Sequence, residues 1–213
     1  SRGLGDVYKR QEMMRFKSVP LPWDGEWQRV FGNPEINDMW FISGPSASGK
    51  SSFCMQLAKK LCEYGSVLYV SVEEGTKMSF CQRLRRYHME EVQSKFRVVD
   101  NGNLDDLKER LHKRKSAKFI ILDSLQLLQS TFGWTFQDAL GLMAEFPHKC
   151  FIFISQEYKS EPMGKTAGKL KYQASVKVRV NGYKAVCQGR FIKEAGAEFE
   201  VWQDGVIQTS NNL

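Results

Sequence analysis

A glycine-rich turn between an apolar strand and an amphipathic helix constrains the fold more than any other feature of this chain. The apolar run over residues 40–43 predicts the strand, and Phe53, Leu57 and Leu61 share one face of a helix expected over residues 51–64. The turn fits the pattern G-x-x-x-x-G-K-[ST], in which glycines allow backbone N–H groups to surround a phosphate. The expected phosphate-binding residues are Gly44, Pro45, Ser46, Ala47, Ser48, Gly49, Lys50, Ser51 and Ser52.

Three side chains are expected to act on the phosphates and on a metal ion. The Lys50 ammonium is placed to reach the β- and γ-phosphate oxygens, and the Ser51 hydroxyl is a ligand for Mg²⁺. Asp123 lies in the apolar strand over residues 119–124, where an acid orients the water shell of Mg²⁺. A strand-end Asp also commonly caps a turn, but the P-loop favours the metal role. The sequence therefore predicts ATP and Mg²⁺ as cofactors.

The carboxylate that activates water is expected on another strand. Ser124 follows Asp123, whereas P-loop hydrolases that keep their base beside this acid carry a Glu there. Glu73 and Glu74 follow the strand over residues 67–72, at the edge where parallel sheets bind their ligands. Glu73 is predicted as the base and Glu74 is its rival. The alternative to both is a pair of solvated loop carboxylates.

Strands and helices alternate through most of the chain. Further strands are expected over residues 96–99 and 150–155, and helices are expected to begin at Asn103 and to cover residues 135–146. This spacing predicts βαβ units and a parallel sheet covered on both faces. The pattern then alternates from Ser175, turns at Asn181-Gly182, and ends with a strand over residues 198–202 and a turn at residues 204–205. The predicted class is α/β, a mainly parallel sheet flanked by helices, with antiparallel strands at its C-terminal edge.

Composition narrows the class of protein. The chain has 31 Lys and Arg against 24 Asp and Glu, a surplus of +7 that suits nucleic acid, nucleotide phosphates or solubility alone. Its apolar runs fall far short of the roughly 20 residues that span a bilayer, so no membrane partner is expected. Five cysteines and three histidines have neither the spacing of a zinc site nor that of a disulfide framework. We therefore expect a cytoplasmic protein without zinc.

The first eleven residues, SRGLGDVYKRQ, differ in character from the rest of the chain. They lack the apolar centre of a signal peptide and resemble a translated sequencing adaptor. The alternative is a genuine basic arm that touches nucleic acid. No linker or repeat interrupts the remaining sequence, so residues 12–213 are expected to form a single domain.

Several segments resemble the RecA-like ATPase core, and the match is strongest to the ATPase domain of the bacterial RadA (Sms) family. The matching segments are residues 67–74, 83–85, 121–126, 188–191 and 199–201. In the fourth segment Gln188 and Ile192 replace the Lys and the last Gly of that family's K-N-R-F-G motif, and only Arg190 and Phe191 carry over. The resemblance implies a RecA-like fold and a DNA-dependent ATPase of recombination or repair, assembled as a homo-oligomeric ring or filament. The family's zinc module and protease-like domain are absent from this sequence, which we expect of a core carried by a mobile element.

The resemblance also assigns candidate roles outside the P-loop. Gln156, which closes the strand over residues 150–155, matches the residue that senses the γ-phosphate. Residues 157–171 are expected to form a flexible basic loop able to track DNA, through Lys159, Lys165, Lys169 and Lys171. Arg190 is a candidate arginine finger or DNA contact, and pairing with Glu194 or Glu198 is its third option.

Three functions remain open at this point. The leading one is an ATP-hydrolysing motor domain that acts on DNA. The second is a small-molecule or nucleotide kinase, for which Arg83, Arg85 and Arg86 are candidate lid residues. The third is a nucleotide-dependent switch with slow hydrolysis. DNA-stimulated turnover, phosphoryl transfer to an acceptor, and binding without turnover distinguish them.

Overall fold

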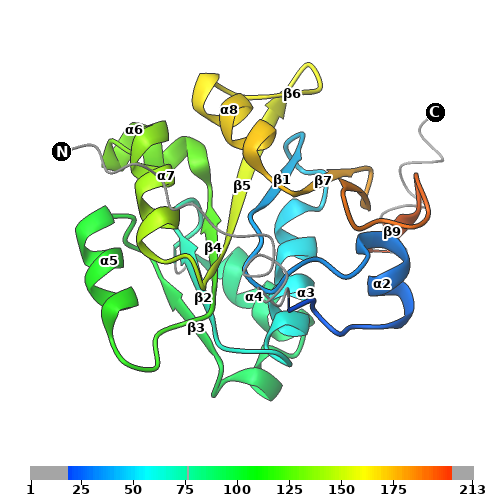
Figure 1. The fold of residues 1–213 in the computed structure, drawn as a ribbon, viewed down its shortest axis with the longest axis horizontal. Helices are drawn as coiled ribbons and strands as arrows, with labels where there is room; N and C mark the ends of the chain where they lie inside the picture. Colours follow the sequence, from blue (N-terminus) through cyan, green and yellow to red (C-terminus); the bar gives the residue numbers. More distant parts are fainter. Residues whose placement is uncertain (1–18, 76, 203–213) are drawn as a thin grey trace, which may run out of the picture.

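A nine-stranded sheet forms the centre of the computed structural model, which describes residues 19–75 and 77–202 (Figure 1). The strand order is β3-β2-β4-β5-β1-β7-β8-β9, and β6 pairs with β5. Strands β1 to β5 and β7 are parallel, whereas β8 and β9 are antiparallel. The strands are β1 Trp40–Gly44, β2 Val67–Ser71, β3 Phe96–Val99, β4 Phe119–Asp123, β5 Cys150–Tyr158, β6 Glu161–Pro162, β7 Val176–Asn181, β8 Lys184–Gly189 and β9 Glu198–Glu200. The fold class predicted from the sequence is confirmed.

Helices cover the parallel part of the sheet on both faces. One face packs against α2, α3 and α4, and the other packs against α5 to α8. The strands alternate accordingly: Trp40 and Ile42 lie in the first core, and Phe41 lies in the second. The helices are α2 Gly25–Phe31, α3 Lys50–Leu61, α4 Met78–Arg86, α5 Leu104–His112, α6 Leu125–Phe132, α7 Phe136–Glu145 and α8 Lys165–Gln173, with a 3₁₀ helix η1 at Met89–Val92. None of the helices in the described ranges is long and apolar enough to cross a membrane.

Local signals fixed several elements close to their predicted positions. Asn103 caps α5 by accepting hydrogen bonds from the amides of Asp105 and Asp106. Thr135 and Asp138 form a capping box at the start of α7. Two short helices, α2 and α6, were not anticipated, because seven or eight residues give too few turns for a clear period. Residues 1–11 and the expected turn at residues 204–205 lie outside the described residues.

The hairpin turn differs from its predicted position by one residue. Asn181 pairs with Lys184, so the two central residues are Gly182 and Tyr183, both with positive φ, as a type I′ turn requires. A tyrosine is uncommon at such a position. Here the Tyr183 amide donates to the Ser48 carbonyl at 3.1 Å, and its own carbonyl accepts from Val201 at 2.8 Å. The first bond holds the turn against the phosphate loop, and the second holds it against the segment that follows β9.

The prediction of a flexible basic loop over residues 157–171 is wrong. Strand β5 continues to Tyr158, turns back as β6, and is followed by α8. Ala167 and Leu170 lie on one face of α8 and pack into the second core, which gives this basic segment a reason to fold as a helix. The amphipathic spacing was present in the sequence but was outweighed by its glycines and lysines.

Gly44 has a close neighbour that forbids a larger side chain. A Cβ at this position would collide with the Val180 carbonyl oxygen and would lie 2.9 Å from the Ser48 hydroxyl. We expect Gly44→Ala to lower the free energy of unfolding by about 2–3 kcal/mol, or roughly 4–10 °C in Tm. The control is Gly141→Ala inside α7, where nothing lies within 4 Å and helix propensity should add about 0.5–1 kcal/mol. Thermal unfolding of both variants checks this, and equal Tm values would contradict it.

Candidate functional site

A cavity of about 320 Å³ lies at the carboxyl ends of the parallel strands. Its wall contains residues 46–52 of the phosphate loop, so the strand-turn-helix context expected from the sequence is present. Glu73 and Glu74 enter it after β2, Asp123 enters it from the end of β4, and Gln156 enters it from β5. The structure thus brings the predicted phosphate, metal, base and sensor residues to one cavity. Gly44 and Pro45 lead into the loop from β1.

The phosphate loop turns tightly into α3. Gly49 has a φ of +97° and is the N-cap residue of that helix, and a Cβ there would lie 2.9 Å from the Tyr183 ring. The Lys50 ammonium donates back to the Pro45 carbonyl inside the loop. Burial lowers the pKa of Lys50, and the nearby charges of Glu73 and Asp123 oppose that shift. Lys50 forms no ion pair with any described residue, and a cation of this kind at the N-terminus of a helix suits a phosphate group.

Asp123 is buried beside the loop. Its Oδ2 accepts a hydrogen bond of 2.7 Å from the Tyr69 hydroxyl, and 6 % of the residue is exposed. Burial raises the pKa of Asp123 to about 6, and the Tyr69 hydrogen bond opposes this shift only in part. The following peptide bond, Asp123-Ser124, is cis. A carboxylate buried in this way is stabilised by a cation placed next to it.

The two neighbouring glutamates have different partners. Gln156 Nε2 donates to Glu73 Oε1 at 3.0 Å, and no described residue binds Glu73 Oε2. Glu74 has both oxygens occupied by the Arg83 guanidinium, at 2.5 and 3.0 Å. An arginine fork of this kind neutralises a carboxylate and holds it in place. Within the described part of the chain, Glu73 in the cavity wall therefore has one oxygen without a partner, and Glu74 has none.

Unpaired hydroxyl groups around the cavity test whether a nucleotide with Mg²⁺ fits. Among the described residues, the buried hydroxyls of Ser48, Ser71 and Ser124 have no hydrogen-bond partner. Ser48 and Ser124 line the cavity, and Ser71 pairs with Asp123 across the sheet. A buried polar group without a partner costs about 1–3 kcal/mol. Their clustering at the phosphate loop, together with Ser51 and Asp123, fits a hydrated metal ion and phosphate oxygens.

The structure adds four cavity residues that were not assigned to the nucleotide. Arg83 and Arg86 come from α4, Tyr183 from the hairpin turn, and Trp202 follows β9. The Arg86 guanidinium lies 5.7 Å from the Trp202 ring, whose centroid is 5.2 Å from that of Tyr183. The arginines were noted in the sequence only as kinase lid candidates. The local sequence does not predict that Tyr183 and Trp202 line the cavity, because their position depends on where the antiparallel strands end.

The remaining predicted residues lie away from the cavity. Arg190 follows β8, whose last residue, Gly189, pairs with Val176 at the start of β7. Arg190 therefore lies at the end of the strands opposite the phosphate loop. Lys159 lies near the Tyr158 ring, and Lys169 lies over the Phe136 ring. Neither Arg190 nor the lysines of residues 159–171 line the nucleotide cavity. Their proposed roles remain predictions.

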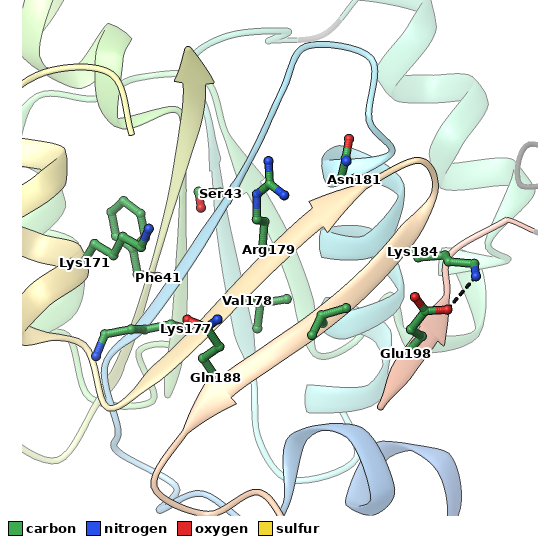
Figure 2. Close-up of a pocket in the computed structure, with 11 residues that line it drawn as sticks. Phe41, Ser43, Lys171, Lys177, Val178, Arg179, Asn181, Lys184, Gln188 and Glu198 are labelled. Carbon is green, nitrogen blue, oxygen red and sulfur yellow. Dashed lines mark hydrogen bonds and ion pairs between the residues drawn. The ribbon is translucent and has the colours of Figure 1, made fainter. Parts of the chain in front are cut away.

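A second cavity of about 390 Å³ covers the face of β7 and β8 that faces away from α3 (Figure 2). Lys171 and Lys177 line it, together with two cations that already have acidic partners. Arg179 binds Glu157 at 3.0 Å and Lys184 binds Glu198. The Glu157 side chain, 1 % exposed, also accepts from Ser43 beside the phosphate loop. Glu157 thus holds two residues that line the second cavity, Ser43 and Arg179, a contact that the sequence analysis did not predict.

These features define a P-loop protein of the RecA-like fold. The chain belongs to the family described as "Cobinamide kinase / cobinamide phosphate guanyltransferase", whose family model matches residues 40–166, more than half of the chain. It also has the RecA-like fold and is related to RadA, as the resemblance predicted. Relatives of this class imply nucleotide binding and hydrolysis, with Mg²⁺.

Two curated relatives support the link to RadA. The "DNA repair protein RadA" of Streptococcus pneumoniae is 29 % identical over 106 residues, which are 49 % of this chain and 24 % of that protein. The protein of the same name from Streptococcus pyogenes is 28 % identical over 106 residues, 22 % of its length. The matched stretch thus spans about a quarter of these relatives.

A solved structure supports the fold. The flagellar accessory protein FlaH from Methanocaldococcus jannaschii superposes with a TM-score of 0.58 at 17 % identity, over 85 % of this chain and 93 % of that chain. At this identity the similarity concerns the fold alone.

Proposed function

We propose that this protein binds ATP with Mg²⁺ and hydrolyses it, and that DNA stimulates the hydrolysis. The observation that carries the proposal is the 3.0 Å hydrogen bond from Gln156 to Glu73, which joins the candidate sensor to the candidate base. Glu73 Oε2 is the atom that takes the proton from the attacking water. The phosphate-loop amides and Lys50 bind the phosphates, and Ser51 and Asp123 hold Mg²⁺, which neutralises charge on the phosphate oxygens.

Gln156 provides a route from the nucleotide to the surface. The backbone N–H of Gln156 donates to Gln126 Oε1 at 3.1 Å, and its backbone carbonyl accepts from the Met163 N–H at 2.9 Å. Gln126 in turn donates to the Met163 carbonyl at 3.0 Å. These bonds tie the sensor to the segment that leads into α8 and its lysines. A change in the Gln156 side chain with phosphate state would therefore reach a basic helix, which supports coupling to DNA.

The position of Arg190 supports an oligomer. It lies at the end of the strands opposite its own phosphate loop, so it reaches a γ-phosphate only if a second subunit presents it. Rings and filaments build sites between subunits in this way. RadA is named as a DNA repair protein, and a role in recombination, repair or mobile-element replication, in the cytoplasm, is the finer part of this proposal.

We expect single-stranded DNA to raise the ATP turnover of the wild-type chain about tenfold or more, because DNA contacts would shift the segment that is hydrogen-bonded to Gln156. Steady-state phosphate release with and without DNA measures this. Lys50→Ala should abolish both rates, because it removes the cation that binds the phosphates. Equal rates with and without DNA would contradict the DNA-dependent part, and turnover retained by Lys50→Ala would contradict the site.

A second candidate is transfer of a phosphoryl or nucleotidyl group to a small molecule. The family description names a kinase and a guanyltransferase, and Arg83 and Arg86 line the cavity as kinase lid arginines would. Arg83 is held by Glu74, however, so it is less free to close over a substrate. Labelled ATP or GTP incubated with cobinamide and with cobinamide phosphate tests this, and label on the acceptor would favour this candidate over hydrolysis.

A further inference from the structure

The excess of positive over negative charge in this chain is concentrated at one end of the parallel strands. Two hollows lie beside the loop after α5, at the amino ends of β2, β3 and β4. Figure 1 shows this end of the strands away from β6 and α8. Eight Lys or Arg side chains line them, from segments 95–97 and 110–118 and from Lys149, against one carboxylate, Glu145. The whole chain has 31 Lys and Arg and 24 Asp and Glu. Outside the two hollows, 23 basic and 23 acidic side chains therefore remain. We call these eight side chains the basic edge.

The first hollow, about 570 Å³, holds a buried ammonium. Lys149 is 5 % exposed and donates to the Ser116 hydroxyl at 2.9 Å and to the Ala117 carbonyl at 2.6 Å, both neutral acceptors. Burial lowers the pKa of Lys149. Glu145, the one carboxylate of this hollow, is already bound by Lys108 and His112. A buried cation with no anionic partner among the described residues favours an anion in the hollow.

The second hollow, about 390 Å³, lies on the β3 side of the same loop. Lys113, Arg114 and Lys115 line both hollows and are exposed. Only Lys113 of these three has an ion pair with a described residue, a solvent-exposed one with Glu109 at 3.3 Å. The loop itself is anchored, because the Ser116 amide and hydroxyl donate to the Lys113 and Leu111 carbonyls. The loop is thus a fixed ridge of three cations between two basic hollows.

We propose that the basic edge binds the phosphodiester backbone of a nucleic-acid duplex. Repeated phosphates match cations that continue from one hollow to the next across the ridge, and a single small anion would fill only one hollow. Of the residues that line the two hollows, Phe146 is buried, so no exposed Phe, Tyr or Trp ring is available for an unpaired base to stack on. The exposed rings are the imidazoles of His112 and His148, and that of His112 is already bound by Glu145 and packed on Phe146. Binding through phosphates alone suits a duplex and is independent of its sequence.

The test measures binding of a fluorescent 30-base-pair DNA duplex, without nucleotide, over a range of salt concentrations. Substituting Gln at Lys113, Arg114 and Lys115 together should weaken binding about tenfold or more. It should also make the slope of log K against log salt shallower by roughly 2–3, since each lost phosphate contact removes about 0.9. The matched control substitutes Gln at Lys77, Lys184 and Lys193, which removes three charges from other faces, and should keep the wild-type slope.

Further measurements distinguish duplex binding from ATP hydrolysis and from the binding of small anions. The inference does not rest on the proposed ATP hydrolysis, so Lys50→Ala should bind the duplex as the wild type does. Single strands of the same sequence should bind less tightly, and inorganic phosphate at matched ionic strength should not displace the duplex. An equal loss in both triple variants, displacement by inorganic phosphate, or no duplex binding by the wild type would overturn the proposal.

Discussion

Glu73→Gln should lower ATP turnover by about 10²–10⁴-fold while ATP affinity changes little. Gln cannot take the proton of the attacking water, but it preserves the size of the side chain and its hydrogen bond with Gln156. In the proposed site Lys50 and the loop amides bind the phosphates, so the ground-state complex should form as before. Single-turnover hydrolysis, with a separate measurement of ATP binding, checks both halves.

Glu74→Gln is the matched comparison, one residue further along. The carboxylate of Glu74 neutralises Arg83, whose side chain is 15 % exposed, so its loss should cost about 1–3 kcal/mol of stability. Its effect on turnover should stay below about tenfold, because no free oxygen of Glu74 faces the cavity. If Glu74→Gln were the slower enzyme and Glu73→Gln the less stable protein, the assignment of the base would be reversed.

The sequence was sufficient for the parts of the site that are set by local chemistry. The phosphate loop needs glycines, a lysine and a helix start within eight residues, and all are visible as letters in a row. Asp123 and Glu73 were found because the carboxyl ends of parallel strands meet at one edge, which is a property of the fold class. Whether these residues have their predicted roles remains for experiment.

Other parts depend on contacts between distant residues. Tyr183 meets Gly49 only because β7 lies beside β1, and the Glu157–Arg179 pair joins strands on either side of β1. The basic edge combines residues more than fifty positions apart, and net charge alone gives no position for them. The sequence predicted one flexible basic loop over residues 157–171, whereas its lysines are distributed over a turn and a helix.

Asp123→Asn should make the protein more stable at neutral pH without Mg²⁺ and should abolish turnover with it. Its ordinary pKa of 3.8 is raised to about 6 by burial, so the folded protein retains a proton that the unfolded chain has lost between these values. The free energy of unfolding therefore falls as pH rises from about 4 to 6. A shift of this size corresponds to at most about 3 kcal/mol, which Asn avoids because it carries no charge.

Chemical denaturation in a chelating buffer at pH 7.5 and at pH 4 measures the effect. We expect Asp123→Asn to exceed the wild type by about 1–3 kcal/mol at pH 7.5, with the difference closing at pH 4, where both side chains are neutral. Mg²⁺ with ATP should raise the wild-type Tm by mass action and raise that of the variant much less. A variant less stable than the wild type at pH 7.5 would mean that Tyr69 stabilises the carboxylate more than burial destabilises it. Asp123 would then be a structural residue, because a carboxylate whose role is to bind a metal ion is expected to lower the free energy of unfolding until that ion binds.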